Sequence, residues 1–450
     1  MRLPLPLCHE NPRGPSGTFR RTTRGKAVAV VPLLATALVL TGCGSGGNGS
    51  GSSANGKPEG TITFQTWNLR TNYKDYFDGL IADFEKQYPD VHVKWVDQPA
   101  DNYAEKLSAD AAAGTLPDVV NVSPDLSYPL AKAGLLLNLD KEPAAAKYKA
   151  EYTPQAWQGD QLPGLGGSYS FPWYLNTGPL FYNKALFRQA GLNPDDPPKT
   201  YDQLFADADA MARHSHGTIA AFAQSPSIED FGRYGVQLMN SDETAFTYNS
   251  AKGVQLLTAY KTLYDEGGLG SQALSTTPDA AGQAFLQQKV AMNPGSAHDL
   301  DNFKVNAPDL YKNIGITDAP DNTGHPNMYL MGLAVNNTSE HKAAAIAFAH
   351  FVTDKPNQES FAHKVAIFPS TVGSLDEPYW TKDDGTSEGA VRVASAEALK
   401  GAVNYTPVVM TDQMKIVLQN EVAKALQGKE SPKQALDNAV AQSDRLLRQS

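Results

Sequence analysis

Hydrophobic and polar positions along the chain follow two different periods, and the change from one to the other marks the expected elements. Residues 61–67 and 91–96 alternate with a period of two and are rich in β-branched and aromatic residues, which is typical of strands. Between them, apolar residues recur every three or four positions over 73–88, which predicts an amphipathic helix. The Ala-rich stretch 101–113 predicts a second helix, and 118–122 predicts a short buried strand. This order of elements favours a parallel sheet with right-handed crossovers.

The second half of the chain repeats this style without repeating the sequence. The stretch 181–191 is expected to hold the end of a strand and then a helix. Further strands are expected at 218–223, 289–293 and 330–336, and further helices at 201–213, 251–266, 280–288, 343–352 and 410–448, the last interrupted at 428–432. In open α/β sheets, ligands bind beyond the carboxyl ends of the strands. Two loops are therefore expected to contact a ligand, 67–70 after the first strand and 123–125 after the third.

The N-terminus has the pattern of an export signal. A basic, acid-poor leader precedes an apolar run over 27–40, which is short for a membrane span and has the length of a signal-peptide core. Cys43 follows, and then a Gly/Ser-rich stretch. This arrangement resembles a bacterial lipoprotein signal, which implies cleavage before Cys43 and acylation of its thiol. We expect residues 1–42 to be the signal peptide and 43–57 to be a flexible tether. A general secretory leader with an incidental cysteine is the alternative, and the export route, Sec or twin-arginine, stays open.

Composition and charge narrow the classes of protein that fit. The chain has 450 residues, enough for two domains of roughly 100–200 residues each. A net charge of −10 argues against a nucleic-acid-binding protein, which needs a basic surface. After the leader, the sequence has no apolar run of about 20 residues, which excludes a polytopic membrane protein. The only two cysteines are Cys8, which would leave with the leader, and Cys43, so no disulfide is expected in the mature fold.

Several stretches of sequence, in order along the chain, resemble one known family. They are 62–67, 84–89, 111–120, 130–136, 180–192, 197–204, 285–292 and 428–436. Together they cover nearly the whole chain after the tether, and they resemble the extracellular solute-binding proteins of ABC importers, in the family 1 group that takes up mainly sugars and oligosaccharides.

The resemblance implies an α/β fold of two doubly wound lobes joined by crossing hinge segments, the type II architecture of periplasmic binding proteins. The expected lobe boundaries are 58–172 with 331–366 for lobe 1, and 173–328 with 369–450 for lobe 2. The chain is expected to cross between the lobes near 171–177, 329–332 and 367–371.

The resemblance also implies what the protein does. A member of this group captures a mono- or oligosaccharide in the cleft between the lobes, closes on it by hinge motion and delivers it to permease subunits in the membrane. It is not an enzyme, and it needs no cofactor or metal. We therefore expect a monomer on the extracellular face of a bacterial cell membrane, held there only by its lipid anchor.

A sugar presents C–H faces and many hydroxyls, so its cleft needs flat aromatic surfaces and converging hydrogen-bonding groups. At the first strand end, Trp67 is a candidate platform, and Asn68 and Arg70 are candidate polar contacts; a core position and a solvated turn are the alternatives. Asp125 matches a family position after the third strand where a carboxylate often accepts sugar hydroxyls. Its alternative role is to cap the helix that follows.

The expected crossings hold three aromatic candidates. Family position favours Asn176 as a polar contact and Trp173 or Tyr174 as a platform, unless these aromatics fill the core of the hinge. Tyr329, at the next crossing, is open between the same two roles.

Three further segments are weaker candidates. Where many sugar binders carry an aromatic platform after a glycine, this sequence offers Ser296 or His298 as polar substitutes, which weakens the case for a long oligosaccharide. His214 and His216 have a spacing that suits a metal, but they end an exposed helix. The acidic loop 383–388 has oxygen ligands for calcium, although a solvated surface loop is favoured.

Two other classes of function stay open. A surface-anchored glycosidase would use two carboxylates. The sequence has no Gly-x-Ser-x-Gly elbow, no His-Glu-x-x-His motif, no P-loop, and no dinucleotide fingerprint between a strand and a helix, so other common enzyme classes are not indicated. The third hypothesis keeps the fold but gives it a non-sugar solute, or the role of a sensor or adhesin.

Overall fold

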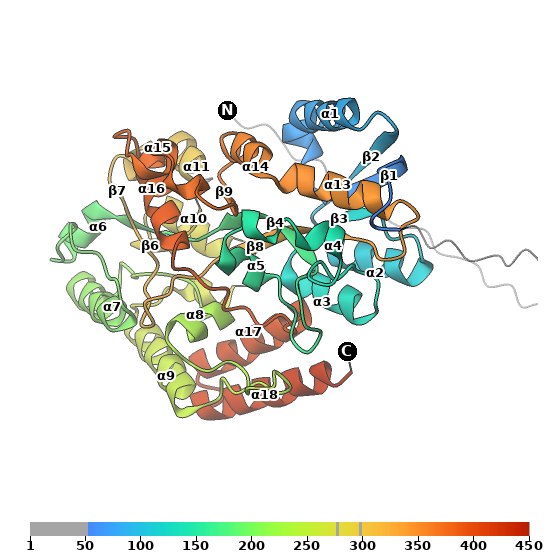
Figure 1. The fold of residues 1–450 in the computed structure, drawn as a ribbon. Coiled ribbons are helices and arrows are strands. Elements are labelled where there is room, and N and C mark those ends of the chain that lie inside the picture. The colour runs from blue at the N-terminus through green and yellow to red at the C-terminus, as the bar shows by residue number, and fades with distance from the viewer. Residues whose placement is uncertain (1–52, 276–278, 297–298, 450) are drawn as a thin grey trace, which may run out of the picture. The chain divides into compact units, whose positions relative to one another are not determined.

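The structure is a computed structural model that places most of the chain after the leader (Figure 1). It describes residues 53–275, 279–296 and 299–449. The predicted signal peptide, Cys43 and His298 lie outside the described residues. The described end of the predicted tether is packed, because Ala54 is buried in a hydrophobic cluster and Lys57 pairs with Asp90.

The larger sheet has six strands in the order β2-β1-β3-β8-β4-β9. Its strands are β1 (Gly60–Trp67), β2 (Val91–Gln98), β3 (Val119–Val122), β4 (Ser170–Asn176), β8 (Tyr329–Val335) and β9 (Phe368–Pro369). As predicted, β1 pairs in parallel with β2 and β3, whereas β8 runs antiparallel to both β3 and β4. The parallel part thus comes from the first three predicted strands, and the antiparallel part adds strands from later in the chain.

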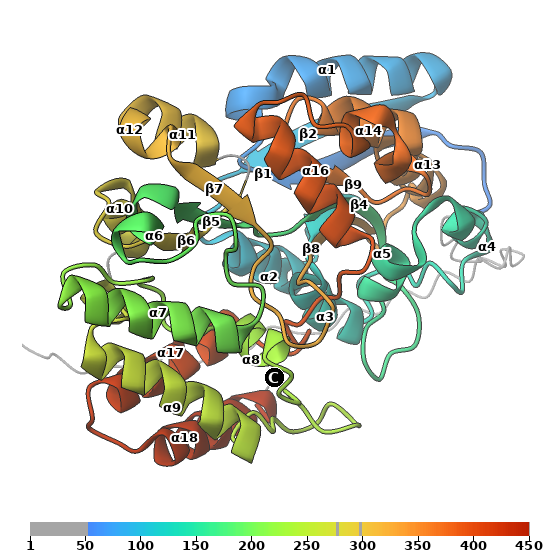
Figure 2. The ribbon, with the colours of Figure 1, turned by 90° about the vertical axis from the view of Figure 1, so that its left-hand side faces the viewer.

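Helices cover both faces of this sheet (Figures 1 and 2). They are α1 (Arg70–Gln87), α2 (Tyr103–Ala113), α3 (Pro124–Lys132), α4 (Pro143–Ala146), α5 (Pro154–Gly159), α13 (Lys342–Thr353) and α14 (Lys355–Ala362). On one face, Phe64 of β1 packs against Phe77 of α1 and Phe348 of α13. On the other face, Tyr103 of α2 and Leu130 of α3 belong to a separate cluster. Because successive side chains of a strand point to opposite faces, one sheet organises two cores.

The smaller sheet has three strands in the order β6-β5-β7, and both pairs are antiparallel. They are β5 (Leu180–Asn183), β6 (Met292–Pro294) and β7 (Ile314–Thr317). The strand predicted at 218–223 is wrong as a continuous strand: only the isolated bridges Ala220–Val290 and Phe222–Leu269 form there. Each bridge reaches a different neighbour, so no continuous ladder of hydrogen bonds develops along the segment.

Helices from two distant parts of the chain surround the smaller sheet. They are α6 (Lys184–Gln189), α7 (Tyr201–Ser215), α8 (Ile228–Arg233), α9 (Ala251–Glu266), α10 (Ala280–Leu286), α11 (Asp299–Asn306), α12 (Pro308–Tyr311), α16 (Ser387–Leu399), α17 (Asp412–Leu426) and α18 (Pro432–Leu447). The short helix α15 (Pro378–Thr381) lies against the larger sheet instead, with Trp380 beside Phe368 of β9. The helix predicted at 251–266 is confirmed with the same ends; Ser250 caps its start, and Gly267 ends it at a φ of 83° that favours glycine. Helices α9, α17 and α18 pack together below the sheets in Figure 1 and share one hydrophobic cluster.

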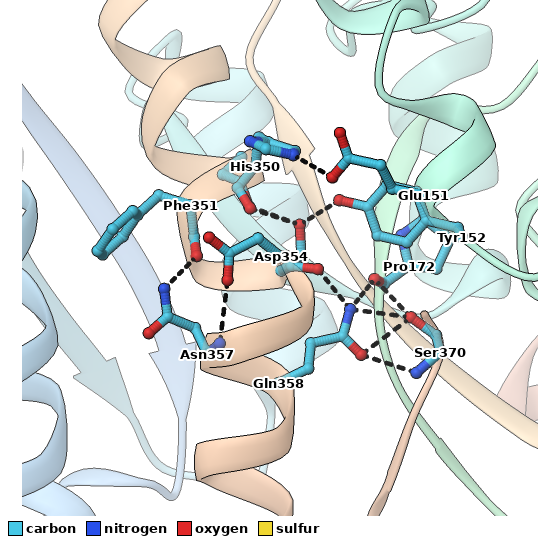
Figure 3. A network of polar contacts seen from close by, with 11 residues as sticks. Glu151, Tyr152, Pro172, His350, Phe351, Asp354, Asn357, Gln358 and Ser370 are labelled. Carbon is cyan, nitrogen blue, oxygen red and sulfur yellow. Dashed lines mark hydrogen bonds and ion pairs between the residues drawn. The ribbon is translucent and has the colours of Figure 1, made fainter. Parts of the chain in front are cut away.

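The strands β4, β8 and β9 lie side by side where the crossings between lobes were predicted. Behind them, Gln358 of α14 holds a buried polar network together (Figure 3). Its amide nitrogen donates to the carbonyl oxygens of Pro172 (3.0 Å) and Thr353 (2.6 Å), and its amide oxygen accepts from the backbone N–H of Ser370 at 2.7 Å. The Thr353 hydroxyl in turn lies 2.7 Å from the hydroxyl of Tyr152. One side chain thereby ties α14 to β4 and to the segment after β9; we name this group the Gln358 network.

Candidate functional site

The loop after β1 is fixed by a carboxylate from the neighbouring strand. Asp97 accepts from the Thr66 hydroxyl (2.6 Å) and from the backbone N–H groups of Leu69 (3.1 Å) and Arg70 (2.9 Å). Asn68 is exposed there, with a left-handed φ of 54°. The Arg70 guanidinium donates to the Trp95 carbonyl at 2.6 Å and lies 4.3 Å from the centre of the Trp95 ring. The Arg70 side chain is therefore already bound to Trp95 of β2. The Asn68 side chain makes no hydrogen bond to β2.

Trp67 ends β1 on the face that carries α2. Its ring is half-buried and lies 6.4 Å from that of Tyr103. Its indole nitrogen has no hydrogen-bond partner among the described residues, and neither has the amide nitrogen of Gln65, two positions earlier on the same face. Two unpaired donors at a strand end are suited to donate hydrogen bonds to a ligand oxygen.

Asp125 lies in the first turn of α3, beside the N-cap position, which Ser123 occupies. The Ser123 hydroxyl donates to the Asp125 carboxylate, so capping by Asp125 itself is not observed. The Lys415 ammonium of α17 approaches the same carboxylate at 3.8 Å and pairs with Asp412 at 3.1 Å. Burial acts to lower the pKa of Lys415, but the carboxylates outweigh it and leave that pKa raised. Asp125 is thus the point where α3 meets α17.

The candidates at the crossings separate into core and surface. Trp173 is 1% exposed and stacks on Phe361, with ring centres 5.6 Å apart, so it fills the core of the larger sheet. Tyr174 follows a bulge in β4 and is half-buried. Asn176 and Tyr329 face each other as the last pair of the β4–β8 ladder, and Tyr329 is 50% exposed.

The hydrogen-bonding groups of Ser296 are used within the turn that leads into α11. Its backbone N–H (2.6 Å) and its hydroxyl (3.2 Å) both donate to the Asp299 carboxylate at the start of α11. Trp67, Asp125 and Tyr329 therefore keep surface that a ligand can use, whereas Trp173 and Ser296 are committed to packing and to a turn.

Three cavities share Ser225 in their linings, and one of them is also lined by Tyr329. The Arg233 cavity holds about 240 Å³ and is lined by Tyr329 together with Arg233 and Gln224. The Gln272 cavity holds about 300 Å³ and is also lined by Gln224. The Lys415 cavity holds about 250 Å³ and has Lys415 in its wall. Of the described predicted site residues, Tyr329 alone lines these cavities.

The Arg233 cavity has an apolar floor and a polar wall. Leu180, Leu204 and Phe222 form part of the floor, together with the rings of Tyr201 and Tyr260. Flat aromatic and apolar surface of this kind is what the C–H face of a sugar packs on.

One carboxylate organises the polar wall. Asp230 accepts from the Tyr201 hydroxyl (2.7 Å) and from the Arg233 guanidinium (2.6 Å) on one oxygen, and from the backbone N–H and hydroxyl of Ser227 on the other. Burial acts to lower the pKa of Arg233, while Tyr201 and Asp230 outweigh it, so that the pKa is raised and the guanidinium keeps its charge. Asp230 is saturated, and it fixes Arg233 at the cavity.

Two atoms of this wall are buried without a partner among the described residues. They are the Nε of Arg233, a donor, and the amide oxygen of Gln224, an acceptor; the Gln224 amide nitrogen donates to Asn293 at 2.6 Å. Buried polar atoms are nearly always paired in native proteins. A donor and an acceptor left over in one cavity therefore point to a ligand that supplies both, as a hydroxyl group does.

Sequence reasoning missed Arg233, Gln224 and Glu229, because it assigned no element to residues 224–233. A signal was present: Ser227 and Asp230 have the spacing of a capping box, and the structure shows both reciprocal bonds at the start of α8.

Two further cavities contain none of the predicted residues. The larger, about 440 Å³, lies between α5 and the segment 402–408, and the other, about 360 Å³, lies between 362–368 and α16. Across the described residues, no group of three or more His, Cys, Asp or Glu side chains is placed to hold a metal ion. Within that same part of the chain, every helix is too short or too polar to cross a bilayer.

Comparisons with known proteins agree with this architecture. The sequence model of one family, described as bacterial extracellular solute-binding protein, matches residues 70–359, which is more than half of the chain. Among curated proteins, the chain is 24% identical over 433 residues to the sn-glycerol-3-phosphate-binding periplasmic protein UgpB of Escherichia coli; the match covers 87% of this chain and 94% of that protein.

Solved structures show the same fold. A candidate oligosaccharide periplasmic-binding protein from Synechococcus sp. MITs9220 matches with a TM-score of 0.75 and 25% identity, covering 86% of this chain and 99% of that one. The sugar-binding protein MalE from Xanthomonas citri matches with a TM-score of 0.71 and 21% identity, covering 87% and 98%. The GacH receptor of Streptomyces glaucescens, solved free and with acarbose, matches with a TM-score of 0.68 and 23% identity, covering 87% and 99%.

Proposed function

Since the chain belongs to the family of bacterial extracellular solute-binding proteins, we propose that it captures a carbohydrate between two lobes and delivers it to the permease of an ABC importer. The observation that carries the carbohydrate is the wall beside Tyr329, where aromatic floor, unpaired donor and unpaired acceptor converge on one cavity. Among the structural relatives, MalE is described as a sugar-binding protein, and GacH is described in complex with acarbose. The relatives compared are binding proteins, which supports capture without chemistry.

Two separate sheets with separate hydrophobic clusters support the lobes expected from the sequence. The neighbouring strands β4 and β8 of the larger sheet would then carry two of the crossings between the lobes, and Asn176 and Tyr329 form the last pair of their ladder. A ligand between Trp67 and Asp125 on one side and the Arg233 cavity on the other would favour the closed state by binding it more tightly than the open state.

The anchor belongs to the same proposal. Acylated Cys43 would hold the protein at the outer face of the cell membrane, and more than one acyl chain is needed to make such anchoring stable. Intact mass of the protein from its native membrane tests this directly: the mass of a chain starting at Cys43 plus acyl groups is expected, and a mature chain without them contradicts it.

The capture itself is tested by titrating the purified protein with mono- and oligosaccharides in a calorimeter, with small-angle scattering on the same samples. Saturable binding with a smaller radius of gyration is expected, and the sugar should be recovered unchanged after long incubation. Hydrolysed sugar would favour the glycosidase hypothesis instead.

A second candidate solute has its own support. The curated relatives are described as binding sn-glycerol 3-phosphate, which carries hydroxyls and a phosphate. The two candidates differ in charge, and that difference can be compared with the charges around the cavities.

A further inference from the structure

The walls of the three cavities carry few charged side chains. The positive ones are already paired with carboxylates, and they are fewer than the negative ones. Of the described residues that line them, only Arg233 and Lys415 are positive, whereas Glu229, Asp230 and Asp279 are negative. The walls therefore have a formal net charge of −1 before any ligand enters.

Neither cation is free to neutralise an anion. The Arg233 guanidinium gives an Nη2 hydrogen to Asp230 at 2.6 Å, and Asp230 is held in turn by Tyr201 and Ser227. Lys415 stands 3.1 Å from Asp412 and 3.8 Å from Asp125. A phosphate in this place would have to compete with carboxylates that are already in position.

What the Arg233 cavity still offers is one donor and one acceptor above an apolar floor. These are the Nε of Arg233, from which a ligand hydroxyl can accept, and the amide oxygen of Gln224, to which a ligand hydroxyl can donate. Glu229 adds a further carboxylate, one oxygen of which already accepts from the Thr406 hydroxyl at 2.6 Å.

We propose that the Arg233 cavity takes an uncharged sugar ring, with Arg233 and Gln224 as its polar partners, and that it excludes phosphate esters. This rests on the proposed function, since it specifies the solute at the same site. Arg233 is then a specificity residue that acts as a hydrogen-bond donor, while Asp230 cancels its charge.

The test compares two matched sets of probes on the full chain by calorimetry. The neutral set is D-glucose, D-tagatose and maltose, and the phosphorylated set is glucose 6-phosphate and sn-glycerol 3-phosphate. Binding of a neutral sugar at least a hundred-fold tighter than any phosphate ester is expected. If a phosphate ester binds as tightly as the best neutral sugar, or tighter, this inference is overturned while solute capture stands. If neither set binds, the proposed carbohydrate function itself fails.

A salt series sharpens the result without altering the protein. For a neutral ligand, Kd should change less than two-fold between 0.05 and 0.5 M NaCl, because there is no ligand charge to screen. A Kd that rises ten-fold or more over that range would mean that ligand charge is recognised, against the proposal.

Substitution then assigns the donor. Arg233→Lys keeps the charge but loses the planar fork, so we expect about ten-fold weaker sugar binding. The matched control is Arg213→Lys on α7, where Arg213 is largely exposed and pairs with Asp209; its affinity should not change. Unchanged sugar affinity in a folded Arg233→Lys variant would remove Arg233 from the site, and if that variant does not fold, the salt series on the unaltered protein decides.

Discussion

Two glutamines in this molecule, the buried Gln358 and the half-buried Gln224, have opposite surroundings. Gln358, behind the crossing strands, uses both ends of its amide: the nitrogen reaches Pro172 and Thr353, and the oxygen accepts from Ser370 (Figure 3). Gln224, in the wall of the Arg233 cavity, bonds to Asn293 through its nitrogen and leaves its oxygen without a partner among the described residues. A satisfied network holds segments of the fold together, whereas an unsatisfied one is available for a ligand.

The largest expected effect comes from the Gln358 network, in which both ends of the amide are hydrogen-bonded. Gln358→Ala leaves the Ser370 N–H and the Thr353 carbonyl oxygen without their side-chain partner, removes one of the two bonds to the Pro172 carbonyl and opens a small cavity, which should together cost about 4 kcal/mol of unfolding free energy. Urea unfolding followed by circular dichroism measures it. The control is Gln189→Ala on the exposed end of α6, expected within about 0.5 kcal/mol of the unaltered protein. A loss below about 1 kcal/mol at Gln358 would mean that the network is not structural.

A buried carboxyl beside β8 gives the next largest effect, as a dependence on pH. Asp160 is 2% exposed, and burial raises its pKa to about 8 from 3.8. The folded protein therefore holds this proton over a range where the unfolded chain has lost it, so the stabilisation is present below about pH 4 and is lost as the pH rises through about 8. Between pH 5 and 8 we expect a loss of roughly 3 kcal/mol from this group.

The variant that isolates this dependence is Asp160→Asn, which cannot ionise. Urea unfolding at pH 5, 6.5 and 8 should show a flatter profile for the variant than for the unaltered protein. If the two profiles have the same slope, the Asp160 carboxyl ionises in the fold at its ordinary pKa, and the contrast between satisfied and unsatisfied buried groups does not extend to it.

A substitution at Gly332 on β8 tests how closely this strand packs against Ser170 of β4 and against Asp160. A Cβ at this position would come within 2.1 Å of the Ser170 hydroxyl oxygen and 3.1 Å of the Asp160 carboxylate. Gly332→Ala should therefore cost about 2 kcal/mol of stability. Gly79→Ala is the matched control, because a Cβ there meets nothing within 4 Å in the middle of α1, and it should stabilise the fold by about 0.5–1 kcal/mol. Thermal unfolding of both variants should move in opposite directions.

The smallest effect is expected on the unsatisfied side. Gln224→Ala removes the unpaired oxygen, and it should weaken sugar binding about ten-fold, or about 1.4 kcal/mol, while stability falls by less than about 1 kcal/mol. Calorimetry and urea unfolding on the same preparation separate the two quantities, and Gln189→Ala again serves as the control. A large loss of stability with unchanged affinity would reverse the assignment of the two glutamines.

The fold could be predicted from the sequence as far as periodicity reaches. Strand β1 and helix α9 were found with almost their observed limits, because an alternation of two or a recurrence of three and four is a local property of the chain. The segment 218–223 has the composition of a strand, but a strand also needs a continuous neighbour, and only Ala220 and Phe222 find single partners. Pairing is a property of the whole molecule, so composition did not reveal its absence.

The site was harder to predict, for a similar reason. Phe171 and Trp173 are two residues apart on β4 and share the core face, while the bulge after Pro172 changes the register before Tyr174. The local sequence does not indicate which aromatic side chain at a crossing stays outside the hydrophobic core. Arg233 was missed because its role depends on Asp230 holding it at a cavity, and that geometry appears only when α8 is packed against the smaller sheet.

Ser225 lies at the junction of the three cavities, and this position has a practical consequence. The chain has only two cysteines, both upstream of the tether's end, so a thiol introduced at 225 is the only one in the folded body. A small environment-sensitive fluorophore attached at position 225 would border all three cavities. The fluorescence of one labelled position would then report solute capture, whichever of the three cavities the solute occupies.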